Sequence, residues 1–226
     1  MKKIKNFFIN PAKAFQGYKE DPKFALNFII AAVGTFIATF VTFIATKDQL
    51  REIAIKSAEK SSHGNQQAID MTVNLMVSPV MHVISSLLAG GMAIGIIALL
   101  AFVYWLLVKI FRGTISYAQA ISVYSLSYVT IVIGEVCRAL YTLIFGQNIT
   151  TAKVNYLNTF LSYFSIFKIW QIVLLVFGIS VVAANISKKK AIAIVLVVTF
   201  LGLLFTLGSV AFADLMSTFS KNMSNI

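Results

Sequence analysis

Residues 24–46 read FALNFIIAAVGTFIATFVTFIAT, a run of 23 residues without one ionisable side chain. At 1.5 Å rise per residue, a helix of this length is about 34 Å long, which exceeds the roughly 30 Å hydrocarbon core of a bilayer. Such a run is typical of a transmembrane helix. It indicates an integral membrane protein and argues against a soluble enzyme.

Four further stretches have the same character, so the sequence predicts an all-α integral membrane protein with a bundle of five transmembrane helices. The composition agrees, because 58% of the residues are hydrophobic and only 12% are charged, about half the charged share of a soluble domain. The sequence therefore predicts that the lipid bilayer surrounds these helices and is one partner of the chain. The spans are expected at residues 24–46, 80–108, 121–145, 161–184 and 191–213, which together form a transmembrane domain over residues 24–213.

The net charge of +11 indicates membrane topology rather than nucleic-acid binding, because the basic residues form short clusters between the apolar runs. Eleven Lys and Arg residues fall on the side of the N-terminus and six on the other side. The positive-inside rule then places the N-terminus in the cytoplasm. With five spans, the short tail at residues 214–226 is extracytoplasmic. We expect a multi-pass protein of the plasma membrane.

The N-terminal segment, residues 1–23, is expected to form a short amphipathic helix on the cytoplasmic side. Asn10 and Pro11 are typical of a helix start, with Asn as the cap and Pro at the first position. Phe15 lies on the apolar face, and Pro22 ends the segment. A basic helix of this kind lies on the membrane surface. It serves either as a topology anchor or as a docking site for a partner.

The outer loop at residues 47–79 is predicted to form an extracytoplasmic helical hairpin. Thr46 and Gln49 resemble a capping box, which predicts a new helix start after the first span. A polar stretch at residues 61–65 separates two amphipathic stretches. Their apolar faces either rest on the outer end of the bundle or receive a partner.

The span at residues 121–145 carries two ionised side chains, Glu135 and Arg138, which would cost very roughly 5–7 kcal/mol to insert. This span must therefore bury its polar face against its neighbours. Lys168 is expected at a similar depth in the next span, so Glu135, Arg138 and Lys168 form a candidate intramembrane charge cluster. Three roles stay open: an ion pair that pins two helices, a site for an anion, a lipid headgroup or the carboxylate of a partner helix, and a proton-coupled site.

Gly91 and Gly95 form a G-x-x-x-G pattern in the second span. Small residues at this spacing let two helix backbones approach closely. The pattern predicts a helix contact, either within one chain or between two chains of a homodimer.

Catalytic, metal-binding and cofactor motifs are missing from the sequence. The two histidines, His63 and His82, stand apart from one another and from the single Cys137. There is no His-Glu-x-x-His, P-loop or Gly-x-Ser-x-Gly pattern. We therefore expect neither an enzyme nor a resident cofactor or metal.

Two passages resemble the Yip family of multi-span membrane proteins, in particular its bacterial relatives. The first is Asn10-Pro11, then Phe15, then Pro22 before the first span. The second is the stretch from Phe111 through Gly113 to Tyr117, which opens the third span. The acidic-glycine-proline motif of the eukaryotic, Rab-interacting members is absent, so that role does not carry over.

The resemblance implies a non-enzymatic membrane protein that works with a partner. Some bacterial relatives resemble accessory subunits of ABC exporters of the MacB type, which protect cells against antimicrobial peptides. The leading hypothesis is therefore an accessory or scaffold protein that contacts a membrane partner, for example an ABC exporter subunit, through its helices. The alternative is a small transporter or channel that uses Glu135, Arg138 and Lys168.

Overall fold

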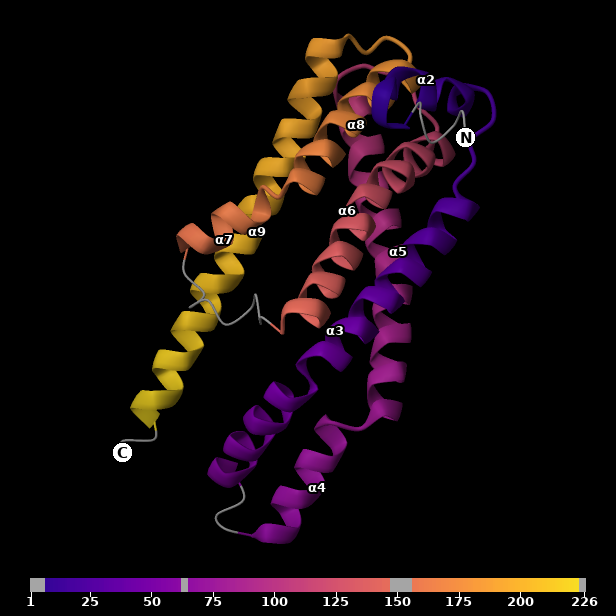
Figure 1. The fold of residues 1–226 in the computed structure, drawn as a ribbon. Helices are drawn as coiled ribbons and strands as arrows, with labels where there is room; N and C mark the ends of the chain where they lie inside the picture. Colours follow the sequence, from indigo (N-terminus) through magenta and orange to yellow (C-terminus); the bar gives the residue numbers. More distant parts are fainter. Residues whose placement is uncertain (1–6, 62–64, 147–155, 224–226) are drawn as a thin grey trace. The chain divides into compact units, whose positions relative to one another are not determined.

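The structure is a computed structural model that describes residues 7–61, 65–146 and 156–223. Helices account for nearly all of these residues, and the described ranges contain no β-strand. The all-α class expected from the sequence is confirmed. In chain order the elements are α2 (Pro11–Phe15), the 3-10 helix η1 (Gln16–Lys19), α3 (Ala25–Ser61), α4 (Gln66–Met76), α5 (Pro79–Ile110), α6 (Tyr117–Phe145), α7 (Tyr156–Tyr163), α8 (Ile166–Val182) and α9 (Lys188–Met223) (Figure 1).

Four helices are long and apolar enough to cross a membrane: α3, α5, α6 and α9. The span expected at residues 161–184 is not one straight helix. Helices α7 and α8 meet at a 50° bend and make a fifth span only if they are counted together. The break lies at Ser165, whose hydroxyl caps the new helix by accepting a hydrogen bond from the amide of Lys168 at 3.2 Å. The described residues therefore contain four candidate spans, or up to five.

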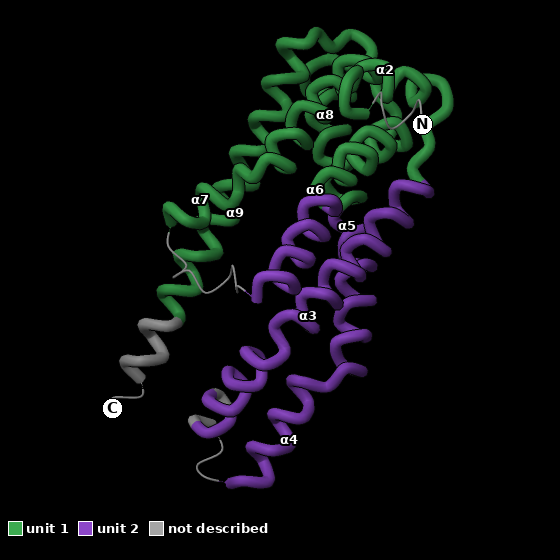
Figure 2. Tube along the Cα trace, in the orientation of Figure 1, with its two compact units in different colours: residues 1–24, 97–131, 150–226 green, residues 25–96, 132–149 purple. Residues whose placement is uncertain are grey.

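The chain divides into two compact units, which are described separately (Figure 2). Unit 1 comprises residues 1–24, 97–131 and 150–226. Unit 2 comprises residues 25–96 and 132–149. Helices α5 and α6 are each divided between the two units.

In unit 1, the connection between α5 and α6 is hydrogen-bonded to the connection between α8 and α9. The amides of Thr114 and Ala184 each donate to the carbonyl of the other at 2.9 Å, as in an antiparallel bridge. The Lys190 ammonium donates to the carbonyl of Phe111 at 3.1 Å. These bonds satisfy loop backbone groups and fix the ends of four helices.

In unit 2, the expected hairpin is formed by the end of α3 and by α4 (Figure 1). Helix α3 continues without a break beyond the first span, so the helix start predicted at Thr46 is wrong. The Thr46 hydroxyl instead donates to the carbonyl of Thr42 at 2.8 Å, a bond within one continuous helix. The two arms bury their own apolar faces against each other, in a small cluster of Ala54, Ala58, Ile69 and Val73.

Helix α6 is the most buried of the candidate spans, as its polar face required. Half of its most apolar window is buried, against 17–28% in α3, α5 and α9. Its buried hydroxyls donate to carbonyls three or four residues earlier in the same helix, for example Ser127 to Val123 at 2.8 Å. The side chains that form these bonds within the helix are each at most 1% exposed: Ser122, Ser125, Ser127 and Thr130.

Candidate functional site

The family-like residues at the N-terminus fold a short helix that inserts one aromatic side chain into unit 1. The side-chain oxygen of Asn10 accepts a hydrogen bond from the amide of Lys13 at 3.3 Å, and Pro11 occupies the first helical position. This local chemistry starts α2. One turn later, Phe15 is 0% exposed.

Gly178 of α8 makes room for Phe15. A Cβ atom at Gly178 would lie 3.1 Å from the Phe15 ring and 2.5 Å from Cγ1 of Val123 on α6. The ring of Tyr18 lies edge-on to that of Phe15, with centroids 6.2 Å apart. Phe15 therefore packs where the N-terminal segment meets α6 and α8.

The expectation that this segment is a free amphipathic helix on the membrane surface is not confirmed. Its Phe15 side chain faces protein, and the Gln119 amide of α6 donates to the carbonyl of Lys19 at 2.7 Å. The segment is thus bonded and packed to unit 1. Pro22 lies in the short irregular stretch between η1 and α3, where it ends the segment as expected.

The second family-like passage also lies in unit 1. Gly113 follows α5, and its amide donates to the carbonyl of Val108 at 2.8 Å. A Cβ atom at Gly113 would collide with the side chain of Ile186 and lie 2.9 Å from Cγ1 of Val108. A larger residue here would require the side chains of Ile186 and Val108 to move.

Glu135 lies in unit 2, at a close crossing of α3 and α6. Its carboxylate accepts a hydrogen bond from the Thr35 hydroxyl at 3.4 Å. The neighbouring Gly34 lies against Val132, in a position where a Cβ atom would collide with the valine side chain. The same stretch of α3 also meets α5, because Gly90 faces the carbonyl oxygen of Ala32.

The structure distributes the three charges of the candidate cluster over the two units. Arg138 is exposed, and no ion pair within 4.0 Å joins it to Glu135 in the described part of the chain. Lys168 belongs to unit 1, where its ammonium donates to the side-chain oxygen of Gln171 at 2.9 Å and lies 5.4 Å from the centre of the Tyr163 ring. The joint cluster of Glu135, Arg138 and Lys168 stays a prediction.

The G-x-x-x-G residues face open space within this chain. A Cβ atom at Gly91 or Gly95 would meet no described heavy atom within 4 Å. Their neighbour Gly90 is the residue that contacts α3, since a Cβ atom there would lie 2.7 Å from the Ala32 carbonyl oxygen. A contact through Gly91 and Gly95 with another chain stays a prediction.

The described residues contain no group of three or more His, Cys, Asp or Glu side chains that could hold a metal ion. His82 already has two neighbours in unit 2. Its Nε2 lies 2.7 Å from the carbonyl oxygen of Met76, and its ring stacks on Phe43 with centroids 3.5 Å apart. This histidine joins the hairpin to α5, a structural role.

Sequence reasoning missed two of the glycines at helix crossings, namely Gly34 and Gly178. Each lies inside an apolar run, where nothing in the run shows which side faces a neighbour. The G-x-x-x-G spacing drew attention to the adjacent face of α5. The only local signal was the pair Gly34-Thr35, a small residue beside a hydroxyl in the most apolar span.

The long apolar helices define a multi-pass membrane protein. Comparison with known families is more specific: the family profile described as Yip1 domain matches residues 5–210. The chain therefore belongs to the Yip1 domain family, as Asn10, Pro11, Phe15, Pro22 and Gly113 had suggested. A search of curated proteins and a search of solved structures each found no match.

Proposed function

We propose that this chain is a non-enzymatic accessory or scaffold protein of the membrane, which acts through helix–helix contacts with a membrane-protein partner. The observation that carries the proposal is the open face of α5 in unit 2. Gly91 and Gly95 lie one turn apart, and a Cβ atom at either position would meet no described heavy atom outside the local helix backbone within 4 Å. Close helix association in lipid depends on small residues of this kind.

The packing of the spans supports a partner of this kind. Only 17% of the most apolar window of α3 and 28% of that of α5 is buried by the chain itself. Both helices therefore retain long apolar faces for lipid or for another helix. The structural engagement of His82 also agrees with a role that needs no general base.

The test is purification of the tagged full chain from its native membranes in mild detergent, followed by mass spectrometry of co-eluting proteins. We expect one stoichiometric membrane partner, which Gly91→Leu displaces. Gly208→Leu is the matched control, because Gly208 on α9 is equally open. Repeated recovery of the chain without a stoichiometric membrane protein would contradict the proposal, and recovery as a homodimer would identify a second copy as the partner.

The resemblance to accessory subunits supplies the specific form of the proposal. The partner would be an ABC exporter of the MacB type, and the pair would protect the cell against antimicrobial peptides. Deleting the gene should then increase sensitivity to such peptides to the same extent as deleting the exporter, with no further increase in the double deletion. An additive double deletion would separate the two proteins.

We also propose a plasma-membrane topology with a cytoplasmic N-terminus and an extracytoplasmic C-terminus. Single cysteines at Gln67 and Lys189, in a Cys137→Ser background, distinguish the two span counts. If α7 and α8 together cross the membrane, three crossings separate the two positions and only Gln67→Cys reacts with an impermeant thiol reagent on intact cells. If they do not, two crossings separate them and both positions label alike.

One observation favours the alternative of a small transporter or channel. The α7–α8 pair is bent by 50° at Ser165, close to Lys168, and transporters build substrate sites at broken helices. Flux through proteoliposomes, compared between the native chain and Lys168→Met, tests this function. A specific flux that the substitution abolishes would favour the transporter over the scaffold.

A further inference from the structure

One face of α5 in unit 1 carries an aromatic stripe that ends in a cation. Ala98, Phe102, Trp105 and Lys109 follow at spacings of four, three and four residues, so they lie on one side of the helix. The ring centroids of Phe102 and Trp105 are 5.4 Å apart. The Lys109 ammonium lies 3.9 Å from the centre of the Trp105 ring.

Tyr117, at the start of α6, forms the second wall of a shallow groove. Its hydroxyl donates to the carbonyl of Ala98 at 2.9 Å, and its ring lies edge-on to those of Phe102 and Trp105. The groove is open to its surroundings and has a volume of about 580 Å³. Its lining is almost entirely apolar and consists of Ala98, Leu99, Phe102, Trp105 and Tyr117.

The length of the groove matches one leaflet of a bilayer. From Ala98 to Lys109 the helix rises about 16 Å, and half of the hydrocarbon core is about 15 Å thick. The polar end coincides with the end of α5 at Ile110, where Trp105 suits the membrane interface. An acyl chain that enters beside Lys109 would therefore lie along the apolar wall over its whole depth.

The cation at the open end has no acidic partner. Lys109 is exposed, and among the described residues no carboxylate lies within 4.0 Å of its ammonium. Arg112 follows after the helix end and is likewise exposed and free of ion pairs in the described ranges. An ammonium over an indole ring keeps N–H donors for an anion at the interface.

We propose that this groove binds an anionic phospholipid, with an acyl chain against Phe102, Trp105 and Tyr117 and the headgroup phosphate at Lys109. The apolar wall selects a chain, and the unpaired cation at headgroup depth selects a negative charge. A phosphatidylcholine headgroup has no net negative charge to attract Lys109. Its quaternary ammonium group cannot stack on Trp105 either, because the Lys109 ammonium already lies over that ring.

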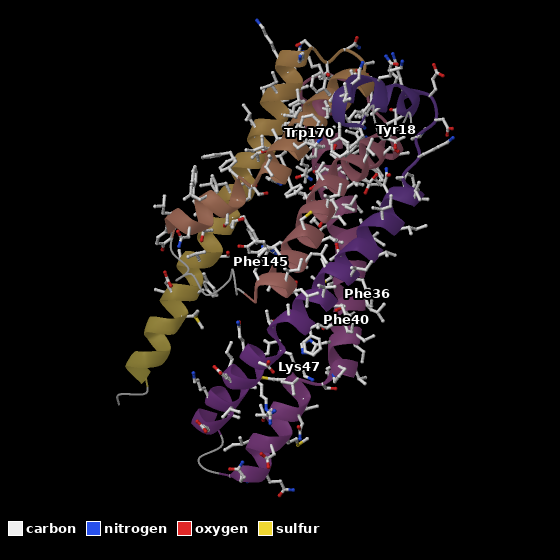
Figure 3. The ribbon with its side chains drawn as sticks, viewed as in Figure 1. Tyr18, Phe36, Phe40, Lys47, Phe145 and Trp170 are labelled. Carbon is white, nitrogen blue, oxygen red and sulfur yellow. The ribbon has the colours of Figure 1, made fainter. Side chains whose placement is uncertain are left out.

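Trp105 is a built-in reporter for this site. The chain has two tryptophans, and the second, Trp170, lies on α8 (Figure 3). The full-length Trp170→Phe variant is reconstituted into phosphatidylcholine vesicles, so that Trp105 is the only tryptophan. The vesicles also contain either brominated phosphatidylglycerol or brominated phosphatidylcholine, at equal mole fraction. Quenching of Trp105 fluorescence by the brominated lipid is measured. We expect the anionic lipid to quench Trp105 with about fivefold higher apparent affinity, the increment typical of one basic side chain at a charged interface.

Lys109→Gln should abolish this preference, whereas Lys189→Gln, which changes a lysine on a different helix, should preserve it. The reciprocal variant Trp105→Phe, with Trp170 as the reporter, should show no preference. Native mass spectrometry of the same variants gives a second readout, in which phosphatidylglycerol stays bound to the native chain and not to Lys109→Gln. The proposal is overturned if the two lipids quench Trp105 equally, or if the preference survives in Lys109→Gln. It is also overturned if another helix protects Trp105 from both lipids.

Discussion

The two units of this protein are packed in different ways. Of the twelve largest side chains that are less than 2% exposed among the described residues, eleven belong to unit 1, and only Ser86 belongs to unit 2. The unit 1 set includes Phe15, Leu174 and Ile179. Unit 2 instead buries mainly small residues, and its buried alanines are Ala31, Ala38, Ala54, Ala58, Ala93 and Ala139.

The difference separates two ways to stabilise a membrane protein. Large interdigitating side chains give unit 1 dense packing with many dispersion contacts. In unit 2, small residues let helix backbones approach, as where Gly90 meets the carbonyl of Ala32. Unit 1 should therefore respond most to the loss of side-chain volume, and unit 2 to the addition of it.

The largest expected effect is the truncation of Phe15 in unit 1. Because this ring is 0% exposed, Phe15→Ala should lower the free energy of unfolding by about 3–5 kcal/mol. Thermal unfolding in detergent measures the change. Phe8→Ala, at a residue 52% exposed, is the control and should change stability little. Equal effects at the two positions would mean that the N-terminal segment does not stabilise unit 1.

The next largest effect is expected at Glu135 in unit 2. If its carboxylate compensates the charge of Lys168, Glu135→Gln should lower the free energy of unfolding by about 3 kcal/mol. This is the lower end of the range for a broken buried ion pair, because Glu135 is only half-buried. Adding Lys168→Met should then recover much of the loss. The double-mutant cycle is measured by thermal stability in detergent.

A second cycle, Glu135→Gln with Thr35→Val, isolates the hydrogen bond that the structure shows. Its coupling free energy should be about 0.5–1.5 kcal/mol, the usual net worth of one hydrogen bond. Additive effects of Glu135 and Lys168 would leave Thr35 as the only partner among the residues tested. The candidate cluster would then be dismissed.

Much of the fold could be predicted from the sequence, because a helix in lipid must satisfy its own backbone and therefore needs a long apolar run. The spans predicted at residues 80–108 and 121–145 lie within α5 and α6. The error at Thr46 arose because Thr at a helix start and Thr within a helix look alike in sequence. Only the bond from Thr46 to Thr42 distinguishes them.

The candidate site was less predictable, because its geometry depends on which helix faces which. Asn10 and Pro11 revealed the start of α2, but not that Phe15 would face Gly178, 163 residues later in the chain. The bend at Ser165 was hidden because α7 and α8 together are long and apolar enough to be predicted as one span. Charges are visible in a sequence, whereas the distance between them depends on the packing.

A smaller effect, of opposite sign at two adjacent positions, is expected on α5. Gly90→Ala should destabilise by about 1–3 kcal/mol, because the new Cβ would lie 2.7 Å from the backbone oxygen of Ala32. Gly91→Ala meets nothing within 4 Å and should stabilise by up to about 1 kcal/mol through helix propensity. Thermal unfolding of both variants in one detergent gives the comparison, and destabilisation at Gly91 alone would contradict the observed face.

The smallest expected effect returns to unit 1 and concerns Arg112. This residue follows the end of α5 and has a φ of 62°, in the left-handed region where glycine is favoured. Glycine occupies the next position instead, because Gly113 must avoid Ile186. Arg112→Gly should therefore stabilise the protein by about 0.5–1 kcal/mol. The substitution removes the strain of an arginine in the left-handed conformation, and the larger conformational entropy of glycine in the unfolded chain offsets part of that gain. Arg112→Ala, which keeps the strained backbone and removes the charge, is the matched control and should not stabilise. If both variants raise the unfolding temperature equally, the stabilisation comes from the lost charge and not from the backbone.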